Sequence, residues 1–285
     1  MAVLQMRKIN ICAMKKNRKK ILEFLQKKGC LEIQETDNED SVFMKMNTAT
    51  QISIFERNAA LAENGLAVLD RYCPENKSMF AGLEGKEQIA SEEFQNSIDH
   101  QQEIMNLINK ILQAQKSMEE KESAMVRCKE EIQSLSPWIS LDVPMNYPGT
   151  KKTGFFIGSI SGTYTQEALT AKIEQLEEMP DSVYAQVITT DKFQTYVTVV
   201  FLRTQQDQVE RALRNFSFNR APLITSHTPE ISVKKRENAI ASIQKEIEAL
   251  RQELEEYSKG RMEIKEVADY YIVRAEKYRV VGSIL

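Results

Sequence analysis

The chain has 285 residues, of which 28% are charged and 7% aromatic, with only ten glycines and seven prolines. A composition rich in charges and poor in helix breakers favours long solvated helices over one thick core. The formal net charge of −3 gives no overall attraction to nucleic acid or anionic membranes, and no apolar run approaches the roughly 18 residues that cross a bilayer.

The start of the chain and its cysteines indicate the compartment. The first residues lack the apolar stretch of a secretory signal peptide. The four cysteines are scattered without a CxxC spacing, which favours reduced thiols. We therefore expect a soluble cytoplasmic protein, or a soluble piece of a larger one.

The N-terminal region has the pattern of a small α/β unit. Residues 5–14 are rich in strand-forming types and partly alternate, and residues 30–36 alternate again. Between them, residues 17–29 fit an amphipathic helix that ends at a glycine. A single βαβ unit cannot bury both faces of its sheet, so residues 48–73 are expected to cover it as a helix.

A run of basic residues, "KKNRKKILEFLQKK", begins this first helix and has seven cations and one acid. Cations at a helix start oppose the helix dipole, at a cost of some tenths of a kcal/mol each. The run is interpreted either as a solvated face or as a docking patch for an acidic partner or lipid headgroups. In the second interpretation the contacts come from Lys15, Lys16, Lys19 and Lys20.

A long helix is predicted over residues 86–136. Apolar residues recur every seven positions, and a second series follows three positions later, which together form the seam of a coiled coil. At 1.5 Å per residue such a helix is about 75 Å long, and Pro137 ends it. The two series are Ile104, Ile111, Met118, Met125 and Ile132, and Leu107, Ala114, Lys121, Cys128 and Leu135.

A second heptad pattern follows Pro229 and continues through Gly260 without a slip. A polar helix with one apolar stripe needs a partner for that stripe. The partner is either a second copy of the chain or the first stripe, which has a similar length. The stripe consists of Val233, Ile240, Ile247, Leu254, Arg261, Ala268 and Ala275, with Arg236, Ile243, Leu250, Tyr257, Ile264, Tyr271 and Tyr278 three positions later.

Between the two patterns lies a compact β-α-β-β-α-β segment, residues 153–225, which is the order of a ferredoxin-like lobe. Residues 153–161 predict a strand, and Thr165 caps the first helix. Residues 183–202 predict a hairpin, and a second helix over 205–216 precedes a last strand at 221–226.

These elements predict an α+β protein shaped as an elongated dumbbell, with two α/β lobes joined by a long antiparallel two-helix coiled coil. The proximal lobe is expected to comprise 1–85 with 262–285, the coiled coil 86–136 and 229–261, and the distal ferredoxin-like lobe 137–228. Antiparallel helices of one chain would face each other through Ile132 with Val233, Met125 with Ile240, Met118 with Ile247, and Ile111 with Leu254.

Motifs that carry chemistry are weak in this chain. Its two histidines, His100 and His227, fall at opposite ends of the predicted coiled coil, so we expect no shared metal or catalytic pair. "GLEGK" at 82–86 has the wrong spacing for a P-loop, and "GSISG" at 158–162 fits an ordinary turn better than a phosphate site. We therefore expect no catalytic, cofactor-binding or metal-binding residues, and no enzyme activity.

Three segments resemble one known family. They are "MAVLQMRKINICAMKKNRKKILEFLQKKGCLEI" at the start, "SPWISLD" after the long helix, and "AEKYRVVGSIL" at the end. Their order and spacing are similar to subunit a of V-type and A-type rotary ATPases, also called subunit I. The match covers that family's cytoplasmic N-terminal half, and Pro137, Trp138, Leu141 and Asp142 correspond to the landmark at the entry to the distal lobe.

The resemblance implies a stator component that links the catalytic head to the membrane rotor housing, in a complex that transports protons or sodium ions. The implied partners are the peripheral-stalk subunits of the E/G type, other stator subunits, and the membrane sector through a C-terminal half that would follow Leu285. It implies a place on the cytoplasmic face of a membrane, with neither nucleic acid nor a small-molecule substrate as partner.

Aromatic residues of the distal lobe and its entry are further candidates for partner contacts. They are Trp138, Phe155, Phe193 and Tyr196, for which a place in the core is the alternative.

A protein of a different class stays open as the alternative, namely a coiled-coil adaptor or hinge-type protein unrelated to ATPases. Such a protein would need a Walker motif or a basic DNA-binding surface, whereas residues 84–136 have eleven acids against six bases. An enzyme built on the distal lobe would need clustered titratable groups, and residues 153–225 have no histidine or cysteine.

Overall fold

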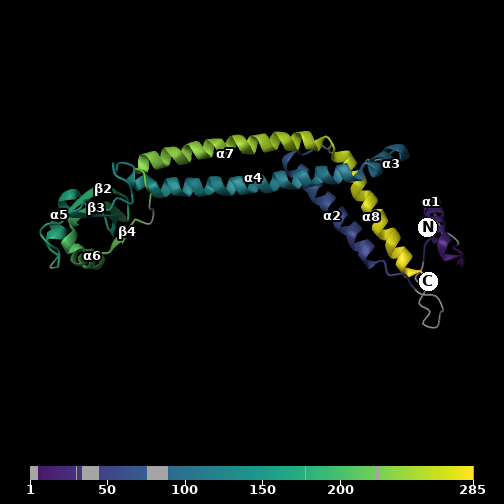
Figure 1. Ribbon diagram of the computed structural model, residues 1–285, viewed down its shortest axis with the longest axis horizontal. Coiled ribbons are helices and arrows are strands. Elements are labelled where there is room, and N and C mark those ends of the chain that lie inside the picture. Colours follow the sequence, from purple (N-terminus) through teal and green to yellow (C-terminus); the bar gives the residue numbers. More distant parts are fainter. Residues whose placement is uncertain are drawn as a thin grey trace, which may run out of the picture. The chain divides into compact units, whose positions relative to one another are not determined.

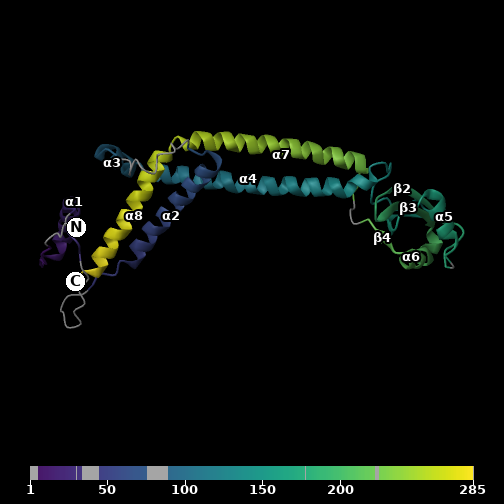
Figure 2. The same cartoon turned by 180° about the vertical axis from the view of Figure 1, so that it is seen from behind.

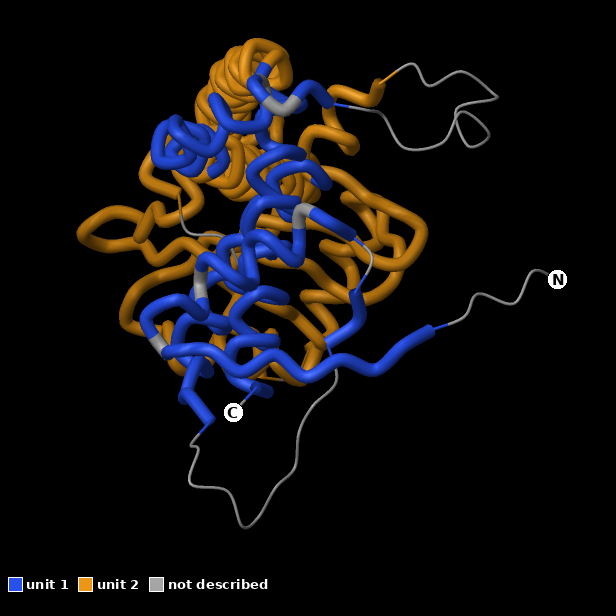
Figure 3. The backbone as a smooth tube through the Cα atoms, turned by 90° about the vertical axis from the view of Figure 1, so that its right-hand side faces the viewer, with its two compact units in different colours: residues 1–67, 77–108, 260–285 blue, residues 68–76, 109–259 orange. Residues whose placement is uncertain are grey.

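The structure is a computed structural model that describes residues 6–29, 31–33, 45–75, 89–176, 178–221 and 225–284. The chain divides into two compact units, shown in different colours in Figure 3. Unit 1 comprises residues 1–67, 77–108 and 260–285, and unit 2 comprises residues 68–76 and 109–259. Helices α2 and α4 each contribute residues to both units.

The described elements of unit 1 are helical. Helix α1 ends at Gly29, which adopts the left-handed conformation (φ 62°) and donates its N–H to the carbonyls of Leu25 and Gln26, as the sequence predicts. The elements are the 3-10 turn η1 (Lys15–Asn17), α1 (Arg18–Lys28), α2 (Ala49–Tyr72), α3 (Ser91–Asp99), the start of α4 (Gln101–Leu135) and α8 (Arg261–Ser283).

The predicted strand at the N-terminus is wrong for the residues that the structure describes. Residues 6–14 form neither strand nor helix, and Met6, Ile9, Ile11 and Met14 are all more than half exposed. Residues 31–33 of the second predicted strand are also irregular, and its other residues lie outside the described part. A strand is stabilised by hydrogen bonds to a neighbour, and the described residues offer none to this stretch.

Helices α2 and α8 pack through an aromatic cluster. The ring of Phe55 lies 6.2 Å from that of Tyr271 and 5.4 Å from that of Tyr278. Glu56 pairs with Arg279 at the same contact. Helix α8 also contacts α3 and the start of α4, through Ser97 with Glu266 and Gln101 with Tyr271. The residues of α8 that are at most 5% exposed are Ile264, Val267, Ala268, Tyr271 and Ala275.

Unit 2 contains a four-stranded antiparallel sheet with the strand order β2-β3-β1-β4. The chain order β1-α5-β2-β3-α6-β4 and this sheet order form a ferredoxin-like lobe. Thr165 accepts a hydrogen bond from the N–H of Ala168 and caps α5, as predicted. The elements are β1 (Thr153–Ser161), α5 (Gln166–Glu174), β2 (Tyr184–Thr190), β3 (Gln194–Leu202), η3 (Arg203–Gln205), α6 (Gln206–Asn215) and β4 (Phe218–Arg220).

The last strand differs from its predicted position. Strand β4 spans Phe218–Arg220 and pairs with residues 158–160 of β1, whereas the sequence predicts it at 221–226. The strand was misplaced because its three residues are too few to show the alternation of apolar and polar side chains that marks a strand in a sequence. Only the pairing with β1 defines it. Gly158 permits the close approach, because a Cβ there would collide with the carbonyl oxygen of Asn219.

Both faces of this sheet are covered. One face packs on α5 and α6 through a core that includes Phe156, Ile160, Leu169, Phe201 and Leu213, all at most 9% exposed. On the other face Ile157 packs against residues 135–145. Successive residues of a strand point to opposite faces of the sheet. Strand β1 therefore buries Phe156 and Ile160 on one face and Ile157 on the other.

Helix α7 (Pro229–Ser258) lies beside α4 in both views of Figures 1 and 2. The long helices are each shorter than predicted. The first predicted helix, 86–136, is divided at His100 between α3 and α4, although its heptad pattern lies wholly within α4 (Gln101–Leu135). The second pattern is divided at Lys259 and Gly260 between α7 and α8. Asp, His and Gly have low helix propensity, which explains why the breaks fall where they do.

Candidate interaction sites

Two ion pairs set the register between α4 and α7 in unit 2. Glu131 of α4 pairs with Arg236 of α7, and Lys121 pairs with Glu246. A step of ten residues forward along α4 is thus a step of ten residues back along α7, so the helices are antiparallel. Lys121 and Arg236 are the charged members of their apolar heptad series, and each finds an acid on the opposite helix.

The contact between Lys121 and Glu246 also has an electrostatic signature. A hydrogen bond from Lys121 lowers the pKa of the Glu246 carboxyl from its ordinary value of 4.5. The charged form of Glu246 is therefore the form that binds α4.

The apolar seam of these helices is graded along its length. Ile111, Met118, Ile247 and Leu254 are buried, and Ile111, Met118 and Leu254 are fully so. The seam residues nearer the lobe, Met125, Ile132 and Ile240, are only half-buried. Two helices alone enclose a stripe from one side, which limits burial in that part of the seam.

The junction between the helices and the lobe is a packed core. Helix α4 ends at Leu135, before the 3-10 turn η2 (Ser136–Trp138) that contains Pro137. Leu135, Trp138 and Ile157 share one cluster, and Val233 of α7 packs against it. The ends of both helices therefore contact the sheet of the same unit through shared apolar side chains.

Three of the four aromatic candidates belong to this junction. Trp138 is 3% exposed and stacks edge-to-face on Tyr196, with ring centroids 5.1 Å apart. Phe155 is half-buried and stacks in the same manner on Tyr147 at 5.3 Å. Trp138, Phe155 and Tyr196 thus hold the junction together, and a partner would reach Trp138 only by displacing this core.

Phe193 is placed differently, at the exposed turn between β2 and β3. Its side chain is 81% exposed. Asp191 holds the turn, because its carboxylate accepts the backbone N–H groups of Phe193 (2.7 Å) and Gln194 (2.9 Å) and the hydroxyl of Tyr196 (2.9 Å). The backbone bonds lower the pKa of Asp191, and burial raises that of Tyr196. Phe193 is thus an exposed apolar side chain on a turn whose backbone Asp191 holds in place.

The edge strand β2 is occupied by a side chain. The amide of Gln166, the first residue of α5, donates to the carbonyl of Ala185 (2.9 Å) and accepts the N–H of Val187 (2.8 Å). Both backbone groups belong to the strand at the edge of the sheet. Gln166 thus takes the hydrogen bonds that a neighbouring strand would make.

The basic candidates fall on η1 and α1 of unit 1. Lys16 and Lys20 are exposed, as both interpretations of the basic run require. The side chains of Lys15 and Lys19 lie outside the described residues. Lys16 lines a hollow together with Arg18, Arg274 and Lys277.

Metal binding, the two histidines and membrane-spanning helices were also considered in the part of the chain that the structure describes. No group of three or more His, Cys, Asp or Glu side chains there could hold a metal ion. His100 and His227 are both exposed, and Nδ1 of His100 lies 2.9 Å from the carbonyl oxygen of Asn96. Among the described helices, none has both the length and the apolar character needed to cross a membrane.

Three features of these sites were not predicted from the sequence: the edge contact of Gln166, the turn contacts of Asp191, and the meeting of η1 with α8. The first two follow from the fold of the lobe. An Asp two residues before an exposed aromatic at a hairpin turn is a weak signal that could have indicated the second.

Of three comparisons with known proteins, only the search of solved structures finds matches. No family model matches the chain, and a search of curated proteins finds no relative. Among solved structures 29 chains match. One of them is described as the crystal structure of the cytoplasmic N-terminal domain of subunit I, homolog of subunit a, of V-ATPase.

The two chains are 15% identical, with a TM-score of 0.47. The match covers 94% of this chain and 85% of the solved one. The family in this description is the one that the sequence segments resemble.

Proposed function

We propose that this chain is a non-catalytic stator component of a V-type or A-type rotary ATPase. It would form part of the link between the catalytic head and the membrane sector that moves protons or sodium ions. The sequence resemblance supports the family, and the antiparallel helices joined to a packed lobe support the mechanical role. We propose no enzymatic activity for the chain itself, and a place on the cytoplasmic face of the membrane.

The observation that carries the proposal is the pairing of α4 with α7 inside one chain. The charged seam positions of both helices are paired across the contact, by Lys121 with Glu246 and by Arg236 with Glu131. A polar residue at a seam position specifies register and partner in coiled coils. The pairing therefore supports an intrachain coiled coil rather than a homodimer.

Rotary coupling needs a part that stays still while the rotor turns. Two helices packed along a seam resist bending better than one, because bending either helix shears the contact between them. The core around Trp138 brings the ends of both helices into contact with the sheet of the lobe. A force applied at the lobe would thus be transmitted to the helices.

We propose the dumbbell arrangement as the form of this stator. Residues 1–85 with 262–285 would form the proximal lobe, 86–136 and 229–261 the coiled coil, and 137–228 the distal lobe. Each lobe would dock one end of an E/G-type peripheral stalk. The membrane sector of the complex would be a further partner.

Disulfide cross-linking tests the intrachain pairing. In a background with the native cysteines replaced by serine, Met125→Cys is combined with Ile240→Cys and oxidised. A monomeric product whose mobility changes on reduction supports the proposal. Exclusively intermolecular products would contradict it, and Val126→Cys with Ile240→Cys is the control, since Val126 is 51% exposed.

Binding to a purified E/G-type pair tests the docking role. The full chain is compared with Phe193→Ala, which removes an exposed ring from the distal lobe, and with Lys16→Gln combined with Lys20→Gln. We expect the full chain to bind and at least one variant to bind more weakly. Tyr184→Ala, which removes another exposed aromatic ring (59%) from β2, is the matched control for Phe193.

An absence of binding by the full chain, with the intrachain disulfide still formed, would contradict the stator role. It would leave an adaptor unrelated to ATPases as the better hypothesis.

A further inference from the structure

The outward face of α1 in unit 1 combines cations with an exposed aromatic ring. Lys20, Phe24 and Lys28 follow one another at steps of four residues, which places them on one side of the helix. All three side chains are exposed, and Phe24 is 60% exposed. Nζ of Lys28 lies over the ring of Phe24, 5.5 Å from its centroid. This face of α1 therefore presents two ammonium groups beside one aromatic side chain.

The opposite side of α1 is held against the end of α8. Leu22 lies on that side and is 8% exposed. Oε1 of Glu23 lies 3.0 Å from Nζ of Lys277, and Arg18 donates to the backbone carbonyl of Ile284 at 3.4 Å. These contacts orient the helix, so its basic and aromatic face is turned away from α8.

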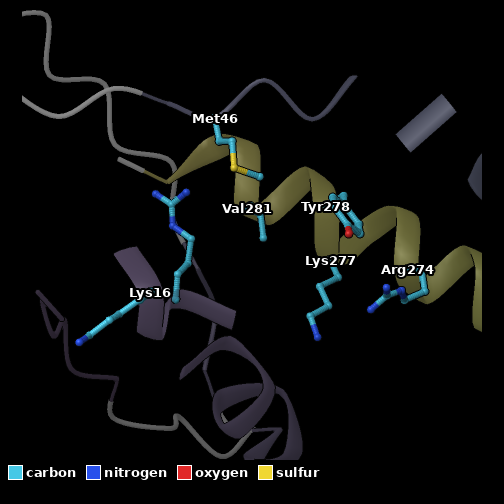
Figure 4. A pocket seen from close by; sticks show the side chains of 7 residues that line it. Lys16, Met46, Arg274, Lys277, Tyr278 and Val281 are labelled. Atoms are coloured by element: carbon cyan, nitrogen blue, oxygen red, sulfur yellow. The ribbon is translucent and has the colours of Figure 1, made fainter. Parts of the chain in front are cut away.

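The region around α1 is strongly positive. Residues 6–29 contain nine basic residues and one acid, Glu23, which pairs with α8. The side chain of Lys16 points away from α8 (Figure 4), and Arg7 and Lys8 are exposed as well. The whole chain has a net charge of −3, but salt screens charges beyond about 8 Å at physiological ionic strength. A local group of cations can therefore attract an anionic surface independently of the rest of the chain.

The stretch before α1 adds exposed apolar side chains. Met6, Ile9, Ile11 and Met14 are 55–79% exposed, in a segment that forms neither strand nor helix. Single exposed apolar residues are common on proteins, whereas several close together mark an interaction surface. A protein partner would need a complementary pocket for each of these side chains. A membrane interface needs no such fit, because apolar side chains enter the boundary between headgroups and acyl chains. The combination of cations and apolar side chains thus favours a lipid surface.

We propose that residues 6–28 bind the surface of an anionic lipid bilayer. The exposed lysines and arginine would lie among the anionic headgroups. The ring of Phe24 and the apolar side chains of residues 6–14 would insert just below them. Lysine stems can lie along apolar surface while their ammonium groups stay with the headgroups. Such contact is peripheral, so it needs no membrane-spanning helix, and it does not depend on the stator proposal.

The test uses the full chain and sedimentation with vesicles of phosphatidylcholine, with and without phosphatidylserine. Lys20→Gln with Lys28→Gln removes both cations from the outward face of α1. Each lysine lost near an anionic surface should weaken binding by about fivefold, so the double variant should bind roughly 25-fold more weakly. The matched control is Lys129→Gln with Lys235→Gln, which removes two exposed cations from α4 and α7. The control should bind like the wild type.

A second pair of variants tests the apolar contribution. Phe24→Ala should weaken binding to the phosphatidylserine vesicles by about tenfold, because the ring no longer leaves water. Tyr184→Ala removes a ring of similar exposure (59%) from unit 2 and should leave binding unchanged. The altered side chains are all exposed, and circular dichroism checks that each variant stays folded.

Three outcomes would overturn the proposal. The first is that the chain does not bind phosphatidylserine vesicles, as expected if the five acids of residues 32–40 neutralise the cations. The second is equal binding to vesicles of phosphatidylcholine alone, which would remove the role of charge. The third is that the variants and their controls lose binding equally, which would indicate diffuse attraction rather than this surface. Saturable binding to polyglutamate without vesicle binding would replace the lipid by an acidic protein partner.

Discussion

The ferredoxin-like lobe and the α4–α7 helix pair belong to the same unit, but their interiors differ in kind. The lobe encloses its sheet on both faces, so that Phe201, Leu169 and Leu213 are at most 1% exposed. The helix pair has only one stripe of contact, and Met125 and Ile240 remain half-buried. Many-sided packing stabilises the lobe, whereas the helix pair depends on a few buried side chains and on charges that define its register.

The largest effect should come from the side chain that joins the two regions. Trp138→Ala removes a 3%-exposed indole from the core shared by the helix ends and the sheet. We expect a loss of about 3–5 kcal/mol in the free energy of unfolding, measured by chemical denaturation. Ile139→Ala, at a 46%-exposed neighbour, is the control and should cost far less. Equal losses would show that the junction is not a shared core.

The gradient along the seam predicts unequal costs for similar changes. Leu254→Ala truncates a fully buried residue and should cost about 2–3 kcal/mol. Ile240→Ala, at a half-buried position of the same helix, should cost roughly half as much. Thermal or chemical unfolding of the two variants side by side measures the difference. Similar losses would argue that the seam is uniform.

Within the lobe, the tight approach of β4 to β1 should be sensitive to a single methyl group. Gly158→Ala places a Cβ against the carbonyl oxygen of Asn219 and the ring of Phe218. Overpacking of this kind costs about 1–3 kcal/mol. Hydrogen exchange at β4 should increase more than at β2. Unchanged exchange at β4 would contradict the close pairing.

The ion pairs should affect specificity more than stability. Because Arg236 and Glu131 are partly exposed (24% and 45%), the single change Glu131→Arg should cost less than about 1 kcal/mol. The charge-swapped double variant, Glu131→Arg with Arg236→Glu, should recover most of that loss. A double-mutant cycle measures the coupling energy, and a value of zero would remove this pair from the account of register.

The smallest effect is a pH dependence at Glu246. Its pKa is lowered in the folded chain by Lys121, so the contact contributes stability above the ordinary value of 4.5. That contribution should be lost as the pH falls from this value through the lowered one. Acid unfolding curves of the wild type and Glu246→Gln should therefore differ at pH 6 and converge on acidification. Parallel curves would contradict the assignment.

Local periodicity predicted much of this fold. Helix α1 with its Gly29 cap, the hairpin of β2 and β3, and α5 with Thr165 all follow from patterns within a few residues. The strand predicted at 5–14 is wrong in its described part, because strand propensity says nothing about whether a partner is near. The position of β4 also depends on pairing, here with Gly158.

The sequence does not show which candidate contact residues are buried and which are exposed. An aromatic residue in a predicted hairpin has the same sequence pattern whether it is covered or exposed. Tyr196 at the junction and Phe193 at the exposed turn could therefore not be told apart. The cations of the hollow come from segments more than 250 residues apart, such as Lys16 and Lys277. No local pattern connects them.

The amide of Gln166 has a consequence for how other molecules could approach the lobe. Since it already satisfies Ala185 and Val187 on the outer side of β2, an incoming polypeptide cannot extend the sheet there without first expelling a side chain. A partner that binds at the β2 edge would therefore have to contact side chains, such as the exposed ring of Phe193, instead of forming backbone hydrogen bonds. The side chain of Gln166 would also hinder two copies of the protein from pairing through their β2 strands.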